Sequence, residues 1–142
     1  MPKNVVATKR IRDPEATRAK ILAAAKQLLC DGEGVVEMSW VAKAAGVSQG
    51  LAYHYFDSKE GLLSAVVNDF YDRVEDAVLM ARLDEESDWE VREKARTQSY
   101  IEFLIDDPLG RIVITKLAGT PAVAAVETSR TLTLLISYRR RE

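Results

Sequence analysis

Hydrogen-bonding and aromatic side chains gather between residues 48 and 59. Gln49 can form paired hydrogen bonds with an adenine edge, whereas tyrosine hydroxyls and a histidine ring can reach phosphate oxygens. Tyr53, His54 and Tyr55 follow one another directly, and neighbouring residues on a helix point about 100° apart. Because three such residues cannot all face a protein core, the run predicts a surface that contacts nucleic acid. Aromatic packing within a small helical core is the alternative.

Two short helices around a tight turn are expected to position these side chains. The first is predicted from Ser39 to Ala45, and Gly46 ends it as a glycine does just past a helix C-terminus. Ser48 can cap a second helix over residues 49–56. This order of elements predicts a helix-turn-helix motif, in which the second helix presents its N-terminal residues to the major groove of DNA.

The spacing of apolar residues predicts helices along the rest of the chain as well. Asp13 and Pro14 begin a helix over about 14–31, and Ser58 caps a long helix whose inward face starts at Leu62. Further helices are expected over about 89–105, 108–118 and 121–136, with an acidic loop at 84–88. The one β-like run, 112–114, is short and isolated. We therefore expect an all-α fold.

The run from Val41 to Leu63, VAKAAGVSQGLAYHYFDSKEGLL, resembles the DNA-binding domain of the TetR/AcrR family of bacterial transcriptional regulators. Its pattern, AGVS-x-G-x-x-Y-x-Y-F-x-S-K-E-x-L, is long and fixed in spacing, and the match covers about residues 14–70. The resemblance implies an N-terminal helix-turn-helix DNA-binding domain at 10–57, with its motif at about 37–56. It also implies a shortened helical region for effector binding and dimerisation at 58–142.

By the same resemblance, DNA would meet the first turn of the bracing helix, the recognition helix and the head of the next helix. The residues carried over are Ser39, Trp40, Ser48, Gln49, Gly50, Tyr53, His54, Tyr55 and Lys59. Ser39 stands where threonine is usual, and both residue types cap a helix. Phe56 and Leu62 would belong to the core. The basic residues near the N-terminus either reach the minor groove or form a solvated tail; they are Lys3, Lys9, Arg10 and Arg12.

The resemblance further implies a repressor that binds a palindromic operator in double-stranded DNA as a homodimer. A small-molecule effector would release it. Candidate residues for the effector pocket are Met80, Trp89, Tyr100 and Phe103. Aromatic residues at helical spacing are more often part of a core, and that alternative stays open for all of them.

Two other kinds of function are also open. Family members generally continue, beyond the point where this chain ends at Glu142, through two helices that build the dimer's four-helix bundle. A truncated regulator that folds without dimerising, and acts as a protein-interaction or non-functional fragment, is therefore one alternative. The other is a small-molecule-binding or enzymatic helical bundle that retains the motif.

Composition excludes several classes of protein. The 142 residues are 47% hydrophobic and 30% charged, which is a globular balance. No apolar stretch approaches the roughly 20 residues of a membrane span, and the N-terminus lacks the apolar segment of a secretory signal. We therefore expect a cytoplasmic protein without a membrane partner. Cys30 and His54, each the one residue of its type, exclude an intrachain disulfide and the common zinc motifs.

Charge is distributed unevenly along the chain. Residues 1–60 carry nine basic and seven acidic groups, whereas residues 61–142 carry eleven basic and fifteen acidic groups. A polyanion is therefore expected to meet the N-terminal part. No general-acid pair and no glycine-rich phosphate loop is present in the sequence, so we expect neither enzymatic activity nor a cofactor or metal.

Overall fold

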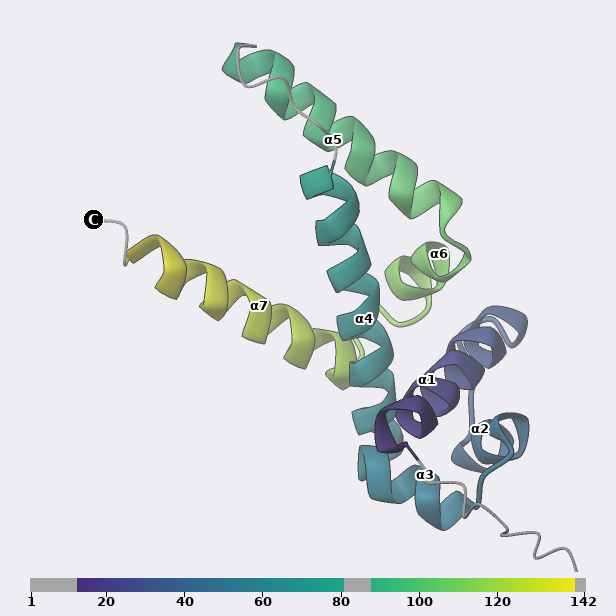
Figure 1. Ribbon diagram of the computed structural model, residues 1–142. Coiled ribbons are helices and arrows are strands. Elements are labelled where there is room, and N and C mark those ends of the chain that lie inside the picture. The colour runs from purple at the N-terminus through teal and green to yellow at the C-terminus, as the bar shows by residue number, and fades with distance from the viewer. Residues whose placement is uncertain (1–12, 81–87, 140–142) are drawn as a thin grey trace, which may run out of the picture.

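The computed structural model describes residues 13–80 and 88–139, and within these ranges it contains helices and no strand (Figure 1). The expected all-α fold is thereby confirmed. The helices are α1 (Pro14–Asp31), α2 (Met38–Ala45), α3 (Gln49–Phe56), α4 (Lys59–Met80), α5 (Trp89–Asp106), α6 (Pro108–Thr115) and α7 (Pro121–Arg139). Most of the loop expected at 84–88 lies outside the described residues.

Local capping explains where three of these helices begin. The Glu15 N–H donates to Asp13 Oδ1 at 3.0 Å, with Pro14 in the first helical position of α1. The Leu51 N–H donates to Ser48 Oγ at 3.1 Å, and the Gly61 N–H donates to Ser58 Oγ at 3.0 Å. The caps predicted at Asp13, Ser48 and Ser58 are thus confirmed.

Some predicted helix boundaries were wrong. The N-cap of α2 is Glu37, and Ser39 lies inside the first turn. The helix starts earlier than predicted because Met38 is buried, at 3% exposure, and anchors that turn in the core. Helix α6 ends at Thr115 rather than near 118, and the chain then turns through Gly119 at φ 77°. Helix α7 continues to Arg139, three residues past the predicted end.

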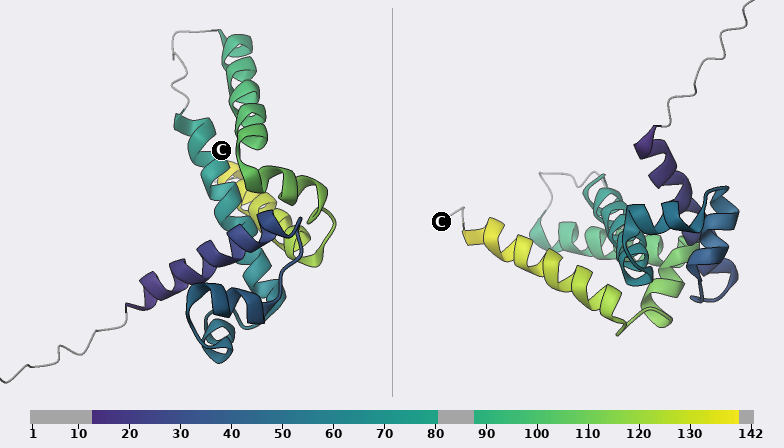
Figure 2. Two further views of the ribbon diagram at one scale, coloured as in Figure 1. Left: turned by 90° about the vertical axis from the view of Figure 1, so that its right-hand side faces the viewer. Right: turned by 90° about the horizontal axis from the view of Figure 1, so that it is seen from below.

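Helix α4 is the central element of the fold. Helices α1, α2 and α3 gather at its N-terminal end, and α6 lies against both α1 and α4 (Figure 1). Helices α5 and α7 pack on α4 and extend away from it in different directions (Figure 2). The small helices at one end of the molecule are therefore joined to the rest mainly through α1 and α4.

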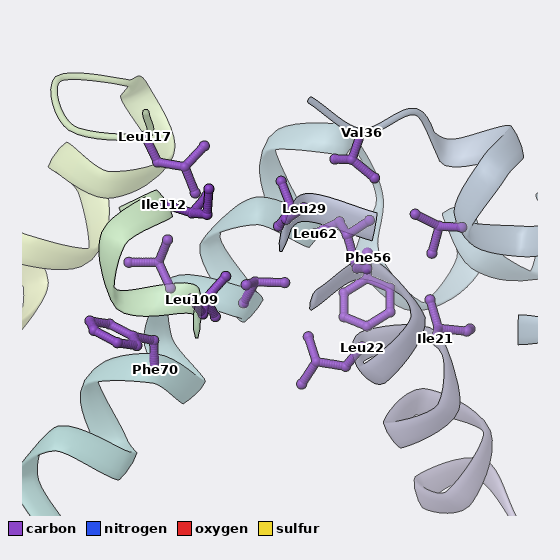
Figure 3. Close-up of a cluster of buried hydrophobic side chains, with 14 of the residues drawn as sticks. Ile21, Leu22, Leu29, Val36, Phe56, Leu62, Phe70, Leu109, Ile112 and Leu117 are labelled. Carbon is purple, nitrogen blue, oxygen red and sulfur yellow. The ribbon is translucent and has the colours of Figure 1, made fainter. Parts of the chain in front are cut away.

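One hydrophobic core joins the small N-terminal helices to α4, α6 and α7. Ile21, Phe56 and Leu62 are buried together where α1, α3 and α4 meet (Figure 3). The same cluster continues through Phe70 to Ile112 on α6. Among the described residues, no polar or charged side chain is buried. The core placement predicted for Phe56 and Leu62 is confirmed.

A glycine holds the corner between α3 and α4. A Cβ on Gly61 would lie 2.0 Å from the carbonyl oxygen of Phe56, which is backbone and cannot swing away. Asp57, at the same corner, has φ 62°, in the left-handed region. The end of α3 and the first turn of α4 are therefore in direct backbone contact.

The turn between α1 and α2 is fastened to the end of α6. Gly34 has φ 90°, and a Cβ there would lie 2.7 Å from Cβ of Lys116. Glu33 ion-pairs with both Arg111 and Lys116, each at 3.6 Å. The turn that leads into α2 thus rests on α6.

Polar contacts hold α7 across α4. Arg130 of α7 pairs with Asp72 and Glu75 of α4, both at 2.5 Å, and its guanidinium lies 5.5 Å from the centre of the Tyr71 ring. The Tyr71 hydroxyl donates to Glu127 Oε1 at 3.2 Å. Helix α7 is therefore attached to α4 by charge and hydrogen bonds in addition to apolar packing.

Candidate nucleic-acid interface

Helix α3 has one exposed polar face and one buried apolar face. Gln49, Gly50, Tyr53 and His54 are all exposed, and their spacing of three and four residues places them side by side on the helix. Ala52, on the opposite face, is buried against the core. Nothing among the described residues covers the polar face, and Tyr53 keeps 41% of its surface exposed.

The turn before α3 fixes the direction of this face. Gly46 ends α2 with φ 68°, and the Val47 N–H donates to the Ala42 carbonyl at 3.0 Å. Val47 is half-buried and packs on the core. Ser48 then caps α3 with its side-chain oxygen, which leaves its hydroxyl proton free to donate outward.

The remaining candidates for DNA contact lie at the edges of this face. Ser39 and Trp40 are exposed in the first turn of α2, where Trp40 keeps half of its surface. Tyr55 is half-buried and packs against the core, with its ring 5.6 Å from that of His54. The basic residues predicted to form an N-terminal arm, at positions 3, 9, 10 and 12, lie outside the described residues.

Lys59, at the head of α4, has a partner that the sequence did not indicate. Its Nζ lies 3.0 Å from Oε1 of Glu37, the residue just before α2. The two residues are 22 positions apart, and no periodicity or motif relates them. Only the folded path of the chain brings them together.

The candidates for an effector pocket are dispersed. Trp89 is 67% exposed at the start of α5, and Tyr100 is 40% exposed. Phe103 is half-buried, with its ring centre 5.9 Å from that of Phe70. The side chain of Met80 lies outside the described residues. A hollow of about 620 Å³ includes Trp89, and among the described residues all of its lining comes from α5.

A second hollow, of about 530 Å³, lies between α1, α4 and the start of α6. Lys26, Arg73 and Asp107 line it, and a chain of ion pairs runs from Lys26 through Asp69 and Arg73 to Asp107. Burial opposes the charge on Asp69, but hydrogen bonds and attraction from Lys26 and Arg73 outweigh it and lower the pKa of Asp69. These charged groups already have partners and tie α1 to α4 and α6.

Cys30, in the wall of the same hollow, is a packing residue. It is half-buried against the core. Burial, together with the nearby charges of Asp107 and Asp31, raises the pKa of its thiol. The thiol therefore stays protonated near neutral pH, which suits a small apolar side chain rather than a reactive one.

The described part of the chain contains neither a metal-binding cluster nor a membrane-spanning helix. No three His, Cys, Asp or Glu side chains come together there in a way that could hold a metal ion. Over those same ranges, no helix is long and apolar enough to cross a membrane.

The geometry of α2 and α3 defines a class of domain. Two short helices at a fixed glycine turn, the second with an uncovered polar face, form a helix-turn-helix domain of the kind that binds DNA. Residues 21–66 match the family model described as bacterial regulatory proteins of the TetR family. This part of the chain is thus a TetR-family helix-turn-helix domain.

Comparisons with individual proteins agree with this family. The HTH-type transcriptional regulator BetI of Rhizobium meliloti (strain 1021) is 38% identical over 69 residues, which are 49% of this chain and 34% of that protein. A solved structure from Shewanella sp. PV-4, assigned to the same family, has a TM-score of 0.64 at 23% identity and covers 75% of this chain and 57% of its own. A TetR-family transcriptional regulator from Haemophilus influenzae Rd gives a TM-score of 0.61 at 22% identity, covering 79% and 62%.

These matches differ in what they cover. The chain spans about a third of the length of the BetI relative, and about three fifths of each of the two solved structures. At their level of identity, the two structures show that the fold is shared. The resemblance seen in the sequence is confirmed.

Proposed function

We propose that α2, α3 and the head of α4 bind double-stranded DNA and that the chain acts as a transcriptional regulator. The observation that carries this proposal is the exposed face of α3, where Gln49, Tyr53 and His54 stand beside Gly50 and no described residue covers them. A face of this kind contributes little to folding and is suited to a groove of DNA. The protein would act by binding rather than by catalysis, in the cytoplasm.

Each group has a role in the proposed complex. Gln49 reads a base edge, since a carboxamide can donate and accept together. Tyr53, His54 and the Ser48 hydroxyl reach phosphate oxygens or nearby base edges. Ser39 and Trp40, at the head of α2, contact the sugar-phosphate backbone of the DNA. Lys59 contacts it at the head of α4. Tyr55 contributes from the edge of the face and also packs α3 on the core.

Regulation would be repression relieved by a small molecule. A homodimer with its recognition helices about 34 Å apart fits successive major grooves on a palindromic operator. A ligand that prefers another spacing would reduce the population that binds DNA. The backbone contact between Gly61 and Phe56 supports this mechanism, because a shift of α4 would move α3 with it.

The experiment is a DNA-binding titration. The purified chain is titrated against labelled duplex from upstream of its own gene at several salt concentrations, with sedimentation in parallel. Saturable binding by a dimer, with log affinity falling linearly in log salt, is the expected result. Tyr53→Ala should weaken binding at least tenfold, whereas Tyr100→Ala, at a tyrosine of nearly equal exposure on α5, should leave the affinity unchanged.

A second candidate function has its own support. Helix α5 has no buried residue among its 18, and Trp89, Val91, Ile101 and Ile105 are each about half exposed or more. A chain that folds without dimerising, and that interacts with other proteins through this apolar face, would have such a helix. A monomer in sedimentation, with weak binding to every duplex regardless of sequence, would favour this alternative.

A further inference from the structure

Glu37 and Lys59 stand at the two ends of the helix-turn-helix motif. Glu37 is the residue before α2, and Lys59 is the first residue of α4, directly after the turn that ends α3. The Glu37 side chain makes no capping hydrogen bond to α2 and instead reaches Lys59 Nζ at 3.0 Å. The contact therefore joins the heads of two helices that both face the proposed DNA site.

Few cations are available on this motif. From residue 37 to residue 60, the chain carries two lysines, Lys43 and Lys59, against three carboxylates, Glu37, Asp57 and Glu60. Binding to DNA depends on cations that neutralise phosphates and release counterions. The ion pair with Glu37 engages one of the two lysines before DNA arrives.

The fold does not depend on this ion pair. The side chains of Glu37 and Lys59 keep 51% and 38% of their surface exposed, and exposed pairs add little to stability. The start of α2 is already anchored by buried Met38, and the start of α4 is capped by Ser58. The fold therefore does not need this ion pair, although the two charged atoms lie only 3.0 Å apart.

We propose that Glu37 sets the strength of DNA binding by competing with phosphate for Lys59. The inference rests on the proposed DNA-binding function. The Glu37 carboxylate accepts one hydrogen bond from Lys59 Nζ and offsets its charge, so a phosphate oxygen must compete with this carboxylate for the ammonium group. Because phosphate contacts carry no sequence information, this competition lowers affinity for all duplexes alike. Glu37 thus limits retention on unspecific DNA.

The test measures binding of the full chain to a short labelled duplex of random sequence, which suffices because the contact is with phosphate. Glu37→Gln should tighten binding about two- to fivefold, as expected for loss of an exposed competing charge. Its log-affinity slope against log salt should steepen by up to about 0.9, which corresponds to one added phosphate contact. Glu60→Gln is the matched control, because it removes an equal charge from the same turn of α4 without releasing Lys59.

A double-variant cycle completes the test. Lys59→Gln should weaken binding, and adding Glu37→Gln to it should then improve affinity no more than Glu60→Gln does. Equal effects of Glu37→Gln and Glu60→Gln in a wild-type background that binds DNA, or no loss with Lys59→Gln, would overturn this inference alone. Failure of the wild-type chain to bind any duplex would overturn the proposed function together with it. Thermal unfolding of each variant establishes that all of them fold.

Discussion

Gly50 is a glycine that the fold itself does not require. It lies inside the first turn of α3, and a Cβ added there would meet nothing within 4 Å. Glycine in a helix costs about 0.5–1 kcal/mol relative to alanine. A partner that approaches the helix closely would explain why a side chain is absent from the centre of the exposed face.

Gly50→Ala should therefore separate folding from binding. We expect the free energy of unfolding to rise by up to about 1 kcal/mol, because the unfolded chain loses conformational freedom while nothing clashes in the folded one. DNA affinity should fall, because the added methyl group stands in the interface. Urea unfolding and the DNA titration measure the two effects. Unchanged affinity in a stabilised variant would show that DNA does not approach α3 at this point.

The chemistry of single residues predicted much of the candidate site. The exposure of Gln49, Tyr53 and His54 followed from their polarity and from the angle between neighbours on a helix. The partner of Lys59 could not be predicted in the same way. Glu37 reaches it because the folded chain brings the heads of α2 and α4 together, and no local pattern relates two positions that are 22 residues apart.

At the scale of elements, the attachment of α7 to α4 depends on a proton. Burial, followed by the charge of Glu127 and the hydrogen bond to it, raises the pKa of Tyr71 from 10.0 to about 12. The unfolded chain loses this proton near pH 10, whereas the folded chain keeps it to about pH 12. Stability from this contact is complete below pH 10 and is lost as pH rises through 12.

Alkaline unfolding tests this contact. The free energy of unfolding of the wild-type chain should decrease between pH 10 and about 12. Tyr71→Phe should be less stable at neutral pH, because its hydrogen bond to Glu127 is missing, and should show a smaller decrease over the same range. Urea titrations at a series of pH values give both curves. Parallel curves for the two proteins would contradict the assigned role of the Tyr71 proton.

Helix starts were easier to predict than helix packing. Asp13, Ser48 and Ser58 cap helices through atoms two or three residues away, so the signal lies within a few positions of sequence. The crossing of α7 over α4 depends on Arg130 and its carboxylate partners, which lie more than 50 positions apart along the chain. Apolar spacing predicts which face of a helix is inward, but not which helix covers it.

At the scale of the whole molecule, the expected DNA-binding domain at 10–57 and the expected effector-binding region at 58–142 differ in their proposed roles. The packing does not separate them. Phe56 is buried against α4, and the core continues without a break from Ile21 on α1 to Val126 on α7. A boundary drawn from the motif alone divides this core. The sequence signal marks the surface proposed to meet DNA, whereas the packing that supports the surface draws on later helices.

The exposure of α5 has a consequence for local unfolding of the chain. A helix without a buried residue loses few contacts when it unfolds locally. The backbone amides of α5 should therefore open at a lower free energy than those of α4, where Val66, Val67 and Phe70 are fully buried. In hydrogen–deuterium exchange, residues 89–106 should take up deuterium well before the middle of α4. Equal protection of the two helices would show that α5 is covered in solution. Binding of a compound or a protein to α5 can therefore be detected as slower exchange at those amides.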